Sequence, residues 1–206
     1  MHILLLGGSP ETLLWDRGPE GSWDVVVCAD GGYNLALKWG IEPDWIIGDG
    51  DSTFVPYPEH IKQEKHPARK DATDCELAID KAVELGASQV TLVGFLGGRL
   101  DHTLANILGI ARRHEVRCVF EEKWGRVFFA EKSNDIFGKK GDLLSLIPVG
   151  GKCEGVTTWG LEYPLKSETL HPFSTRGISN VFLGDSCSVT VETGELLVVH
   201  LRSGVE

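Results

Sequence analysis

Short apolar runs separated by polar, glycine-rich segments dominate the first part of the chain. Runs of this length, rich in Val, Ile and Leu, are typical of strands buried on both faces of a sheet. Segments with helical spacing alternate with them, which is typical of a mostly parallel sheet covered by helices on both faces. The predicted strands are Met1–Leu6, Val25–Ala29, Trp45–Ile47, Val90–Val93 and Val116–Phe120.

Three helices are predicted in this part of the chain. The first covers about residues 33–39 and ends at a glycine. The second covers about residues 73–85, because Thr73 and Glu76 form a capping box at its start. Residues 53–69 are rich in Pro, His and Lys and lack periodicity, so we expect a loop there. The third helix has an apolar face at helical spacing, made of Leu104, Ile107, Leu108 and Ala111.

From about Arg126 the pattern changes to short β-rich runs separated by Gly, Pro and Asp. Residues 187–191 alternate between apolar and polar side chains and precede a Thr-Gly pair, which predicts an antiparallel hairpin. We therefore expect an α/β domain with a mostly parallel sheet over residues 1–125, followed by an all-β antiparallel sandwich over residues 126–206. The runs of the second half are Val127–Phe129, Leu143–Ile147, Val156–Thr158, Val181–Leu183, Cys187–Val191 and Leu196–Leu201.

The chain has 206 residues and a formal net charge of −10. This charge argues against a general nucleic-acid-binding protein, which needs clustered Lys and Arg to neutralise phosphates. No apolar segment reaches the length of a membrane span, and the short apolar run at the start lacks the basic flank of a signal peptide. Five single, scattered cysteines indicate reduced thiols rather than a disulfide framework. We expect a soluble, cytoplasmic protein.

Two carboxylates follow the third predicted strand, in the segment Gly48-Asp49-Gly50-Asp51-Ser52. Their spacing suits one hard cation such as Mg²⁺, which takes one or two carboxylates together with phosphate oxygens. Gly, Asp and Ser are also the commonest turn formers, so a plain polar turn is the alternative. The other polar clusters of the chain bear on this choice.

Three further clusters stand beside predicted strands or helix starts, and they contain Asp30, Lys70 with Asp74, and Arg99 with Asp101. In an open α/β sheet the loops at the carboxyl ends of the strands gather at one edge, where ligands bind. Converging carboxylates would raise one another's pKa values unless a divalent cation binds among them. Lys70 and Arg99 supply positive charge for phosphate. The clusters predict Mg²⁺-assisted transfer of a phosphate-containing group, with the acceptor left open, and no P-loop motif is present.

Each cluster also has a plainer structural explanation. Asp74 alone would interact with the helix dipole, and Asp101 alone would be an N-cap. Arg99 would be a surface ion-pair partner, and His102 an ordinary residue at a helix start. All the clusters together, at one edge of a sheet, favour a shared site.

Taken in order, these clusters resemble those of the thiamine pyrophosphokinase family. The resemblance spans residues 30 to 200, nearly the whole chain. Several motifs in one order are far more specific than any one of them. They are Asp30-Gly31-Gly32, Pro43-Asp44 before the Gly48 segment, Lys70 to Ala78, Gly97 to His102 with Asn106, Gly155 to Leu165, and Gly177 to Asn180.

The resemblance implies an N-terminal domain that binds ATP and Mg²⁺ and a C-terminal sandwich that contributes to the thiamine site. It implies transfer of the β,γ-pyrophosphate of ATP to the thiamine hydroxyl, with release of AMP, by a homodimer whose active site draws on both subunits. The implied magnesium ligands are Asp49, Asp51, Asp74 and Asp101. The other implied site residues are Asp30, Ser52, Lys70, Thr73, Arg99 and His102 for the nucleotide, and Ser179 and Asn180 for the aminopyrimidine.

Two positions depart from the family pattern. Gly50 stands where a bulky apolar or aromatic residue is expected, and residues 121–126 lack an Asp…Asn pattern at the domain junction. Trp159 is either a stacking surface for an aromatic cation or part of the sandwich core. Three residues are candidates for the general base: Asp74, Asp101 and His102.

Two other functions stay open. A hydroxymethylpterin acceptor would keep the N-terminal chemistry, but the motifs at 155–165 and 179–180 argue against it. A non-catalytic sensor of thiamine or its diphosphate would leave the acidic clusters unexplained.

Overall fold

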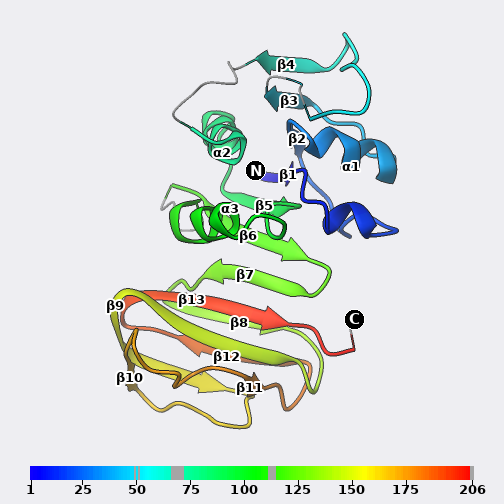
Figure 1. The fold of residues 1–206 in the computed structure, drawn as a ribbon. Helices are drawn as coiled ribbons and strands as arrows, with labels where there is room; N and C mark the ends of the chain where they lie inside the picture. The colour runs from blue at the N-terminus through cyan, green and yellow to red at the C-terminus, as the bar shows by residue number, and fades with distance from the viewer. Residues whose placement is uncertain (49, 51, 66–71, 111–114, 205–206) are drawn as a thin grey trace. The chain divides into compact units, whose positions relative to one another are not determined.

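The chain forms two compact units, Met1–Lys123 and Trp124–Glu206. The first is α/β and the second is all-β (Figure 1). The fold is that of a computed structural model, which describes residues 1–48, 50, 52–65, 72–110 and 115–204.

The first unit is built on a parallel sheet with the strand order β4-β3-β2-β1-β5-β6. The apolar runs form strands because both faces of the sheet are covered, so every side chain of the central strands finds apolar neighbours. The prediction of a mostly parallel sheet is confirmed. The strands are β1 (His2–Leu6), β2 (Val25–Ala29), β3 (Trp45–Gly48), β4 (Lys62–Lys65), β5 (Gln89–Val93) and β6 (Arg117–Glu122).

Strand β4 lies where a loop was expected, so that expectation is wrong for residues 62–65. Its Lys-Gln-Glu-Lys sequence has no apolar pattern because it is the edge strand of the sheet. Lys81 anchors it by pairing with Glu64 at 2.8 Å and lying 4.3 Å from the centre of the Trp45 ring.

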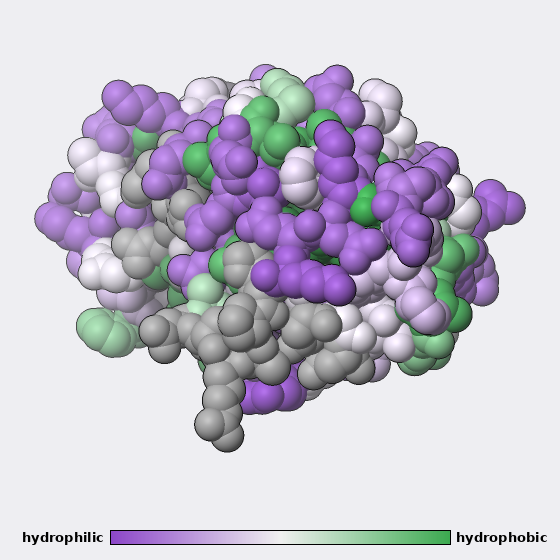
Figure 2. Space-filling model, turned by 90° about the horizontal axis from the view of Figure 1, so that it is seen from above, coloured by the Kyte–Doolittle hydropathy of each residue, from purple (hydrophilic) through white to green (hydrophobic). Residues whose placement is uncertain are grey.

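Viewed from above, the surface of the molecule is mainly hydrophilic (Figure 2).

Helices α1 (Gly32–Trp39) and α2 (Asp74–Glu84) lie on opposite faces of this sheet (Figure 1). Helix α1 begins directly against β1, where a Cβ on Gly32 would lie 1.8 Å from the carbonyl oxygen of Leu6. Only glycine permits this close approach. The predicted capping of α2 is confirmed, since the Thr73 hydroxyl accepts a hydrogen bond from the Glu76 N–H at 3.2 Å.

The third helix differs from its prediction. It consists of α3 (Leu100–Ala105) and a π-helical segment, η2 (Asn106–Ile110). Leu104 and Leu108 of the predicted apolar face are 47% and 43% exposed, so this face is not buried in the described part of the chain. Asn106 is turned inward instead, because its side-chain amide donates to the Phe95 carbonyl at 2.8 Å. Ala111 lies outside the described residues.

The second unit is an antiparallel sandwich in which β9 belongs to both sheets, as predicted for the fold class. The first part of β9 pairs with β13, which also pairs with β7. The last part of β9 pairs with β12, which also pairs with β8. The strands are β7 (Gly125–Phe129), β8 (Ser133–Phe137), β9 (Leu143–Trp159), β10 (Glu168–Leu170), β11 (Asn180–Val181), β12 (Ser186–Thr190) and β13 (Thr193–Leu201).

The predicted hairpin between residues 187–191 and the last strand is wrong. Strands β12 and β13 are consecutive, but each pairs with β9. The alternating pattern shows only that β12 has one buried face. It does not indicate which strand β12 pairs with. Strand β9 has 17 residues, and different parts of it pair with β12 and β13.

All five cysteines are free and buried. Burial raises the pKa of Cys28 and raises that of Cys187 to about 12, so both thiols are unreactive in the folded chain. Among the helices of the described segments, none is long and apolar enough to cross a membrane.

A buried carboxylate ties the end of the second unit to its interior. Asp142 accepts hydrogen bonds from the Ser203 N–H and hydroxyl at 2.8 and 2.9 Å, and from the Lys139 N–H at 2.9 Å. The Nε2 of His200 lies 2.8 Å from Oδ2 of Asp142, and the His200 ring stacks on Phe182. Burial works to raise the pKa of Asp142, but these hydrogen bonds outweigh it and lower the pKa to about 2.

We predict that Asp142→Ala lowers the free energy of unfolding by about 3 kcal/mol at neutral pH, because it leaves several buried donors without an acceptor. Since the folded pKa lies below the ordinary value, this stabilisation is present above about pH 4 and is lost as the pH falls towards about 2. Urea unfolding across this range measures it. Asp135→Ala, on the exposed side of β8, is the control. Equal stability of Asp142→Ala and the parent at neutral pH would contradict the assignment.

Candidate active site

The carboxyl ends of β2 and β3 meet at Asp30. This residue follows β2 with a positive φ of 39°, and its side chain is 5% exposed. Its Oδ1 accepts a hydrogen bond from the Gly50 N–H at 3.0 Å. The first acidic cluster therefore holds the backbone of the second, as expected for loops at one edge of a parallel sheet.

Tyr57 completes this arrangement from the following loop. Its hydroxyl donates to the same Asp30 oxygen at 2.7 Å, and its ring meets Tyr33 edge to face. Gly50 has a φ of +83°, and a Cβ there would lie 3.3 Å from the Tyr57 ring. The departure from the family pattern at Gly50 thus has a local cause, since Tyr57 fills the space beside a left-handed backbone.

Asn34, in the first turn of α1, fixes the chain on the other side of this segment. Its amide nitrogen donates to the Ser52 carbonyl, and its amide oxygen accepts from the Phe54 N–H, both at 3.0 Å. The side chain is 6% exposed. Ser52 and Phe54 are therefore attached to α1, and Gly50 is attached to Asp30.

Three predicted site residues, Asp49, Asp51 and Lys70, lie outside the described residues. In the part of the chain that the structure describes, no three His, Cys, Asp or Glu side chains are grouped so that they could hold a metal ion. The convergence of the acids remains a prediction.

Thr73 and Asp74 stand at the start of α2. Thr73 is the N-cap, and Asp74 lies in the first turn, half-buried. A carboxylate at this position interacts favourably with the helix dipole. The same position is at the N-terminus of a helix that packs on β2 and β3.

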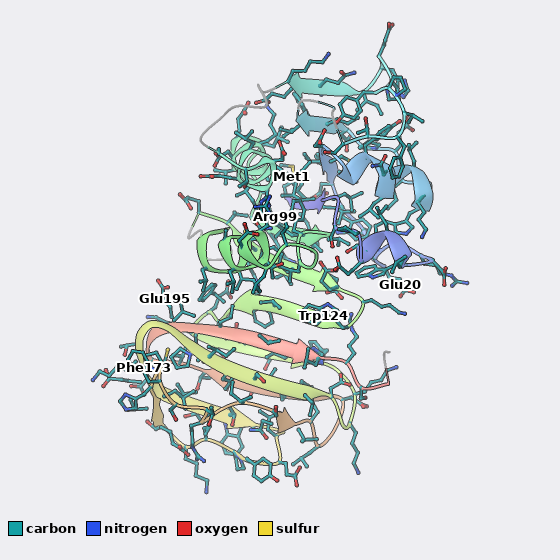
Figure 3. The ribbon with its side chains drawn as sticks, viewed as in Figure 1. Met1, Glu20, Arg99, Trp124, Phe173 and Glu195 are labelled. Atoms are coloured by element: carbon teal, nitrogen blue, oxygen red, sulfur yellow. The ribbon has the colours of Figure 1, made fainter. Side chains whose placement is uncertain are left out.

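Arg99, which is labelled in Figure 3, lies at the start of α3 and pairs with Asp101. The guanidinium donates through Nη2 to Oδ2 at 2.6 Å and through Nε to Oδ1 at 3.1 Å. Arg99, not Asp101, occupies the N-cap position, and its side chain makes no capping bond. The alternative of Asp101 as N-cap is therefore wrong. His102 is exposed, and its N–H donates to Asp101 at 3.0 Å.

This pairing changes the acidity of Asp101. The hydrogen bonds from Arg99 are the largest cause, and together with the His102 N–H they lower the pKa of Asp101 to about 2. The hydrogen bond to Asp101 also raises the pKa of Arg99. Both side chains are more than half exposed, so water and ligands reach them.

The loop that leads to Arg99 is held by side chains from other parts of the first unit. The Gly98 N–H donates to Glu11 Oε1 at 2.8 Å, and the Ser9 hydroxyl donates to the other oxygen of Glu11 at 2.8 Å. The Gly97 N–H donates to the Thr103 hydroxyl at 3.0 Å. The segment after β1 therefore supports the loop after β5.

In the second unit, Trp159 stands at the end of β9 with 70% of its surface exposed. The alternative that it belongs to the sandwich core is wrong. The Thr158 hydroxyl beside it accepts from the Leu165 N–H at 2.8 Å, and the Thr157 hydroxyl accepts from the Ser167 N–H at 3.0 Å. These bonds fix the turn that follows Trp159.

Ser179 and Asn180 differ in their surroundings. Ser179 is exposed with a positive φ of 58°, and its N–H donates to the Ser145 hydroxyl. Asn180 is 5% exposed, and its amide bonds both the N–H and the carbonyl of Tyr163, at 3.0 and 2.7 Å. Asn180 therefore holds the turn after Trp159, while Ser179 faces solvent in a strained conformation.

Two family models match this chain in sequence. Residues 21–120 match the thiamin pyrophosphokinase catalytic domain, and residues 130–198 match the thiamin pyrophosphokinase vitamin B1 binding domain. The chain belongs to the thiamine pyrophosphokinase family. The resemblance found in the sequence is confirmed.

Thiamine pyrophosphokinases of known sequence are similar over most of their length. The protein of Bacillus subtilis is 27% identical over 208 residues, which cover 96% of this chain and 97% of that one. Thiamine pyrophosphokinase 1 of Oryza sativa subsp. japonica is 26% identical over 224 residues, which cover 93% of this chain and 82% of that one.

Solved structures of the family share the fold. The thiamine pyrophosphokinase of Bacillus subtilis has a TM-score of 0.82 at 25% identity, covering 98% of this chain and all (100%) of that one. That of Geobacillus thermodenitrificans has a TM-score of 0.81 at 27% identity, covering 100% of both chains.

Within this thiamine pyrophosphokinase fold, the structure joins Asp30 to the Gly50 segment and Arg99 to Asp101. Asn34, Tyr57 and Glu11 were missed in the sequence. A buried Asn in a helix carried a weak signal, because Asn is a poor helix former. The partners of Tyr57 and Glu11 are distant in sequence, so nothing local indicated them.

We predict that Arg99→Gln raises the pKa of Asp101 from about 2 towards the ordinary value of about 4, because the charged hydrogen bonds are lost. A carboxyl-carbon NMR titration of the Asp side chains measures this shift. Arg176→Gln, which removes the Glu168 partner in the second unit, should leave the Asp101 pKa unchanged. An Asp101 that titrates identically in Arg99→Gln and the parent would contradict the pairing.

Proposed function

We propose that this chain transfers the pyrophosphate of ATP to the hydroxyl of thiamine, giving thiamine diphosphate and AMP in a Mg²⁺-dependent reaction. The hydrogen bond from Gly50 to Asp30 is the observation that carries the proposal. It holds the backbone between Asp49 and Asp51 at the carboxyl ends of the strands, where open α/β sheets bind nucleotides. The two family matches, in this order along the chain, support it.

The proposed magnesium ligands are Asp49, Asp51, Asp74 and Asp101. Carboxylate oxygens are the donors that Mg²⁺ prefers, so the residue types fit the ion. The exposed carboxylate of Asp101 and the fixed backbone at Gly50 are consistent with this assignment. Magnesium, when bound, neutralises charge on the transferred phosphates.

We assign each basic side chain to the nucleotide. Arg99 exchanges Asp101 for phosphate oxygens when ATP binds, which leaves Asp101 to the metal. Lys70 adds charge on the same nucleotide, and Ser52 and Thr73 lie beside it. Asp30 holds the backbone of the loop at Gly50 through a hydrogen bond.

The proton of the thiamine hydroxyl needs an acceptor. The candidates are Asp74, Asp101 and His102. The pKa of Asp101 is lowered to about 2, which makes it a weak base, only while Arg99 is paired with it.

We assign thiamine to residues 126–206 and the nucleotide to residues 1–125. The exposed face of Trp159 suits the aromatic cation of thiamine, with Ser179 beside the aminopyrimidine and Asn180 fixing the turn. The match of residues 130–198 to a vitamin B1 binding domain argues against a pterin acceptor. We propose a cytoplasmic homodimer with active sites at the subunit interface.

Product identity tests the reaction. With ATP, thiamine and Mg²⁺ we expect AMP and thiamine diphosphate in equal amounts, and no product once Mg²⁺ is chelated. Asp51→Asn and Asp101→Asn should each lower kcat by about 100-fold, because a charge that stabilises the transition state is lost. Thermal melting checks that they fold, and Asp135→Asn is the surface control. ADP as product, or near-parental kcat in either variant, would contradict the assignment.

Trp159 tests the thiamine site separately. We predict that Trp159→Ala raises KM for thiamine by roughly tenfold, because a cation–π contact of about 1–2 kcal/mol is lost, while KM for ATP stays unchanged. Trp159→Phe should show a smaller rise. Substitution of Trp124, outside the proposed site, serves as the control. An equal rise in both KM values would point to a general loss of structure instead.

A further inference from the structure

Glu122 is a buried acid that contacts the start of the loop leading to Arg99 and Asp101. Glu122 is the last residue of β6, and its Oε1 accepts from the N–H groups of Gly94 and Leu96 at 3.3 and 3.4 Å. Its Oε2 accepts from the Thr12 hydroxyl at 3.2 Å. One side chain thus joins β6, the segment after β1 and the loop after β5.

Burial makes this acid costly to keep. Glu122 is 3% exposed, and a carboxylate removed from water loses its hydration. Desolvation raises its pKa to about 7, although the hydrogen bonds from Leu96, Thr12 and Gly94 oppose the rise. The alternation of β6 places Phe120 and Cys118 on the same buried side, where an apolar residue would pack more simply. The contacts to the loop are the feature that an apolar residue could not supply.

Other contacts also fix this loop before Arg99, among them a hydrogen bond from the Ser9 N–H to the Gly94 carbonyl at 2.9 Å. Glu11 holds Gly98, Thr103 holds Gly97, and Asn106 holds the Phe95 carbonyl. Glu122 acts at the opposite end, where the chain leaves β5. The acids Glu11 and Glu122 together fix both ends of Gly94–Gly98, and the orientation of Arg99 depends on that backbone.

We propose that Glu122 is a positioning residue for pyrophosphate transfer, which fixes the backbone of Gly94–Leu96 so that Arg99 and Asp101 face the nucleotide. This inference rests on the function proposed above. Glu122 acts through the loop backbone, so its role is one of geometry.

Two substitutions of Glu122 separate geometry from packing. Glu122→Met fills a similar volume without an acceptor, and we expect kcat to fall by about 100-fold with an unchanged KM for thiamine. Glu122→Gln keeps an oxygen acceptor of the same reach, and kcat should stay within roughly threefold of the parent. Thr91→Val is the matched control, because it removes one partly buried hydrogen bond, to His2, from the strand that precedes the loop.

Amide hydrogen exchange gives a readout independent of activity. The Gly94 and Leu96 amides should exchange about tenfold faster in Glu122→Met than in the parent, and at the parental rate in Thr91→Val. Unchanged exchange, or a kcat of Glu122→Met equal to that of Thr91→Val, would overturn the positioning role. An inactive parent protein would instead overturn the proposed function itself.

One further variant covers a Glu122→Met chain that does not fold. Thr12→Val conserves shape and removes only the hydroxyl that holds Oε2, and we expect kcat to fall roughly threefold. Parental kcat and parental exchange at Gly94 in this variant would then overturn the inference.

Discussion

The carboxylate of Asp30 joins two neighbouring strand ends, and the geometry of the first unit depends on that connection. Parallel strands deliver their loops to one edge of the sheet, but the fold alone does not fix the loops. The bonds from Gly50 and Tyr57 to a single carboxylate oxygen do so, in an environment that excludes most water. This arrangement is rigid, because any movement of the loop would leave the buried carboxylate of Asp30 without its hydrogen-bond donors.

The same device recurs along this edge of the sheet. Glu11 holds Gly98, and Glu122 holds Gly94, each through backbone N–H groups. Acids of the first unit therefore act in two ways. Asp30 and Glu122, which are buried, and Glu11, which is exposed, hold backbone. Asp101 is exposed and paired with a cation that a ligand can replace. Net negative charge in this chain thus reflects internal support as well as the proposed chemistry.

Local patterns in the sequence were enough to predict the buried strands and the cap of α2, because each depends on neighbouring residues. Strand β4 could not be predicted, since a charged edge strand is stabilised by Trp45 and Lys81 from elsewhere. The pairing of β12 with β9 could not be predicted either, because the two strands are distant in sequence and the pattern of β12 shows only its buried face. At the site, residue types indicated Asp30 and Asp101. The bonds from Asn34 to Ser52 and from Tyr57 to Asp30 span 18 and 27 positions, which no local pattern records.

Strand β9 has a consequence for the second unit. Its first residues pair with Asn180 and Val181, and its last residue is Trp159. One continuous segment therefore sets both the position of the Asn180 amide and that of the indole. An insertion or deletion within β9 would rotate the two ends relative to each other, since each added residue reverses the face to which later side chains point. The length of β9 therefore sets the separation between Trp159 and the strand that carries Asn180, two residues that we propose belong to one thiamine site.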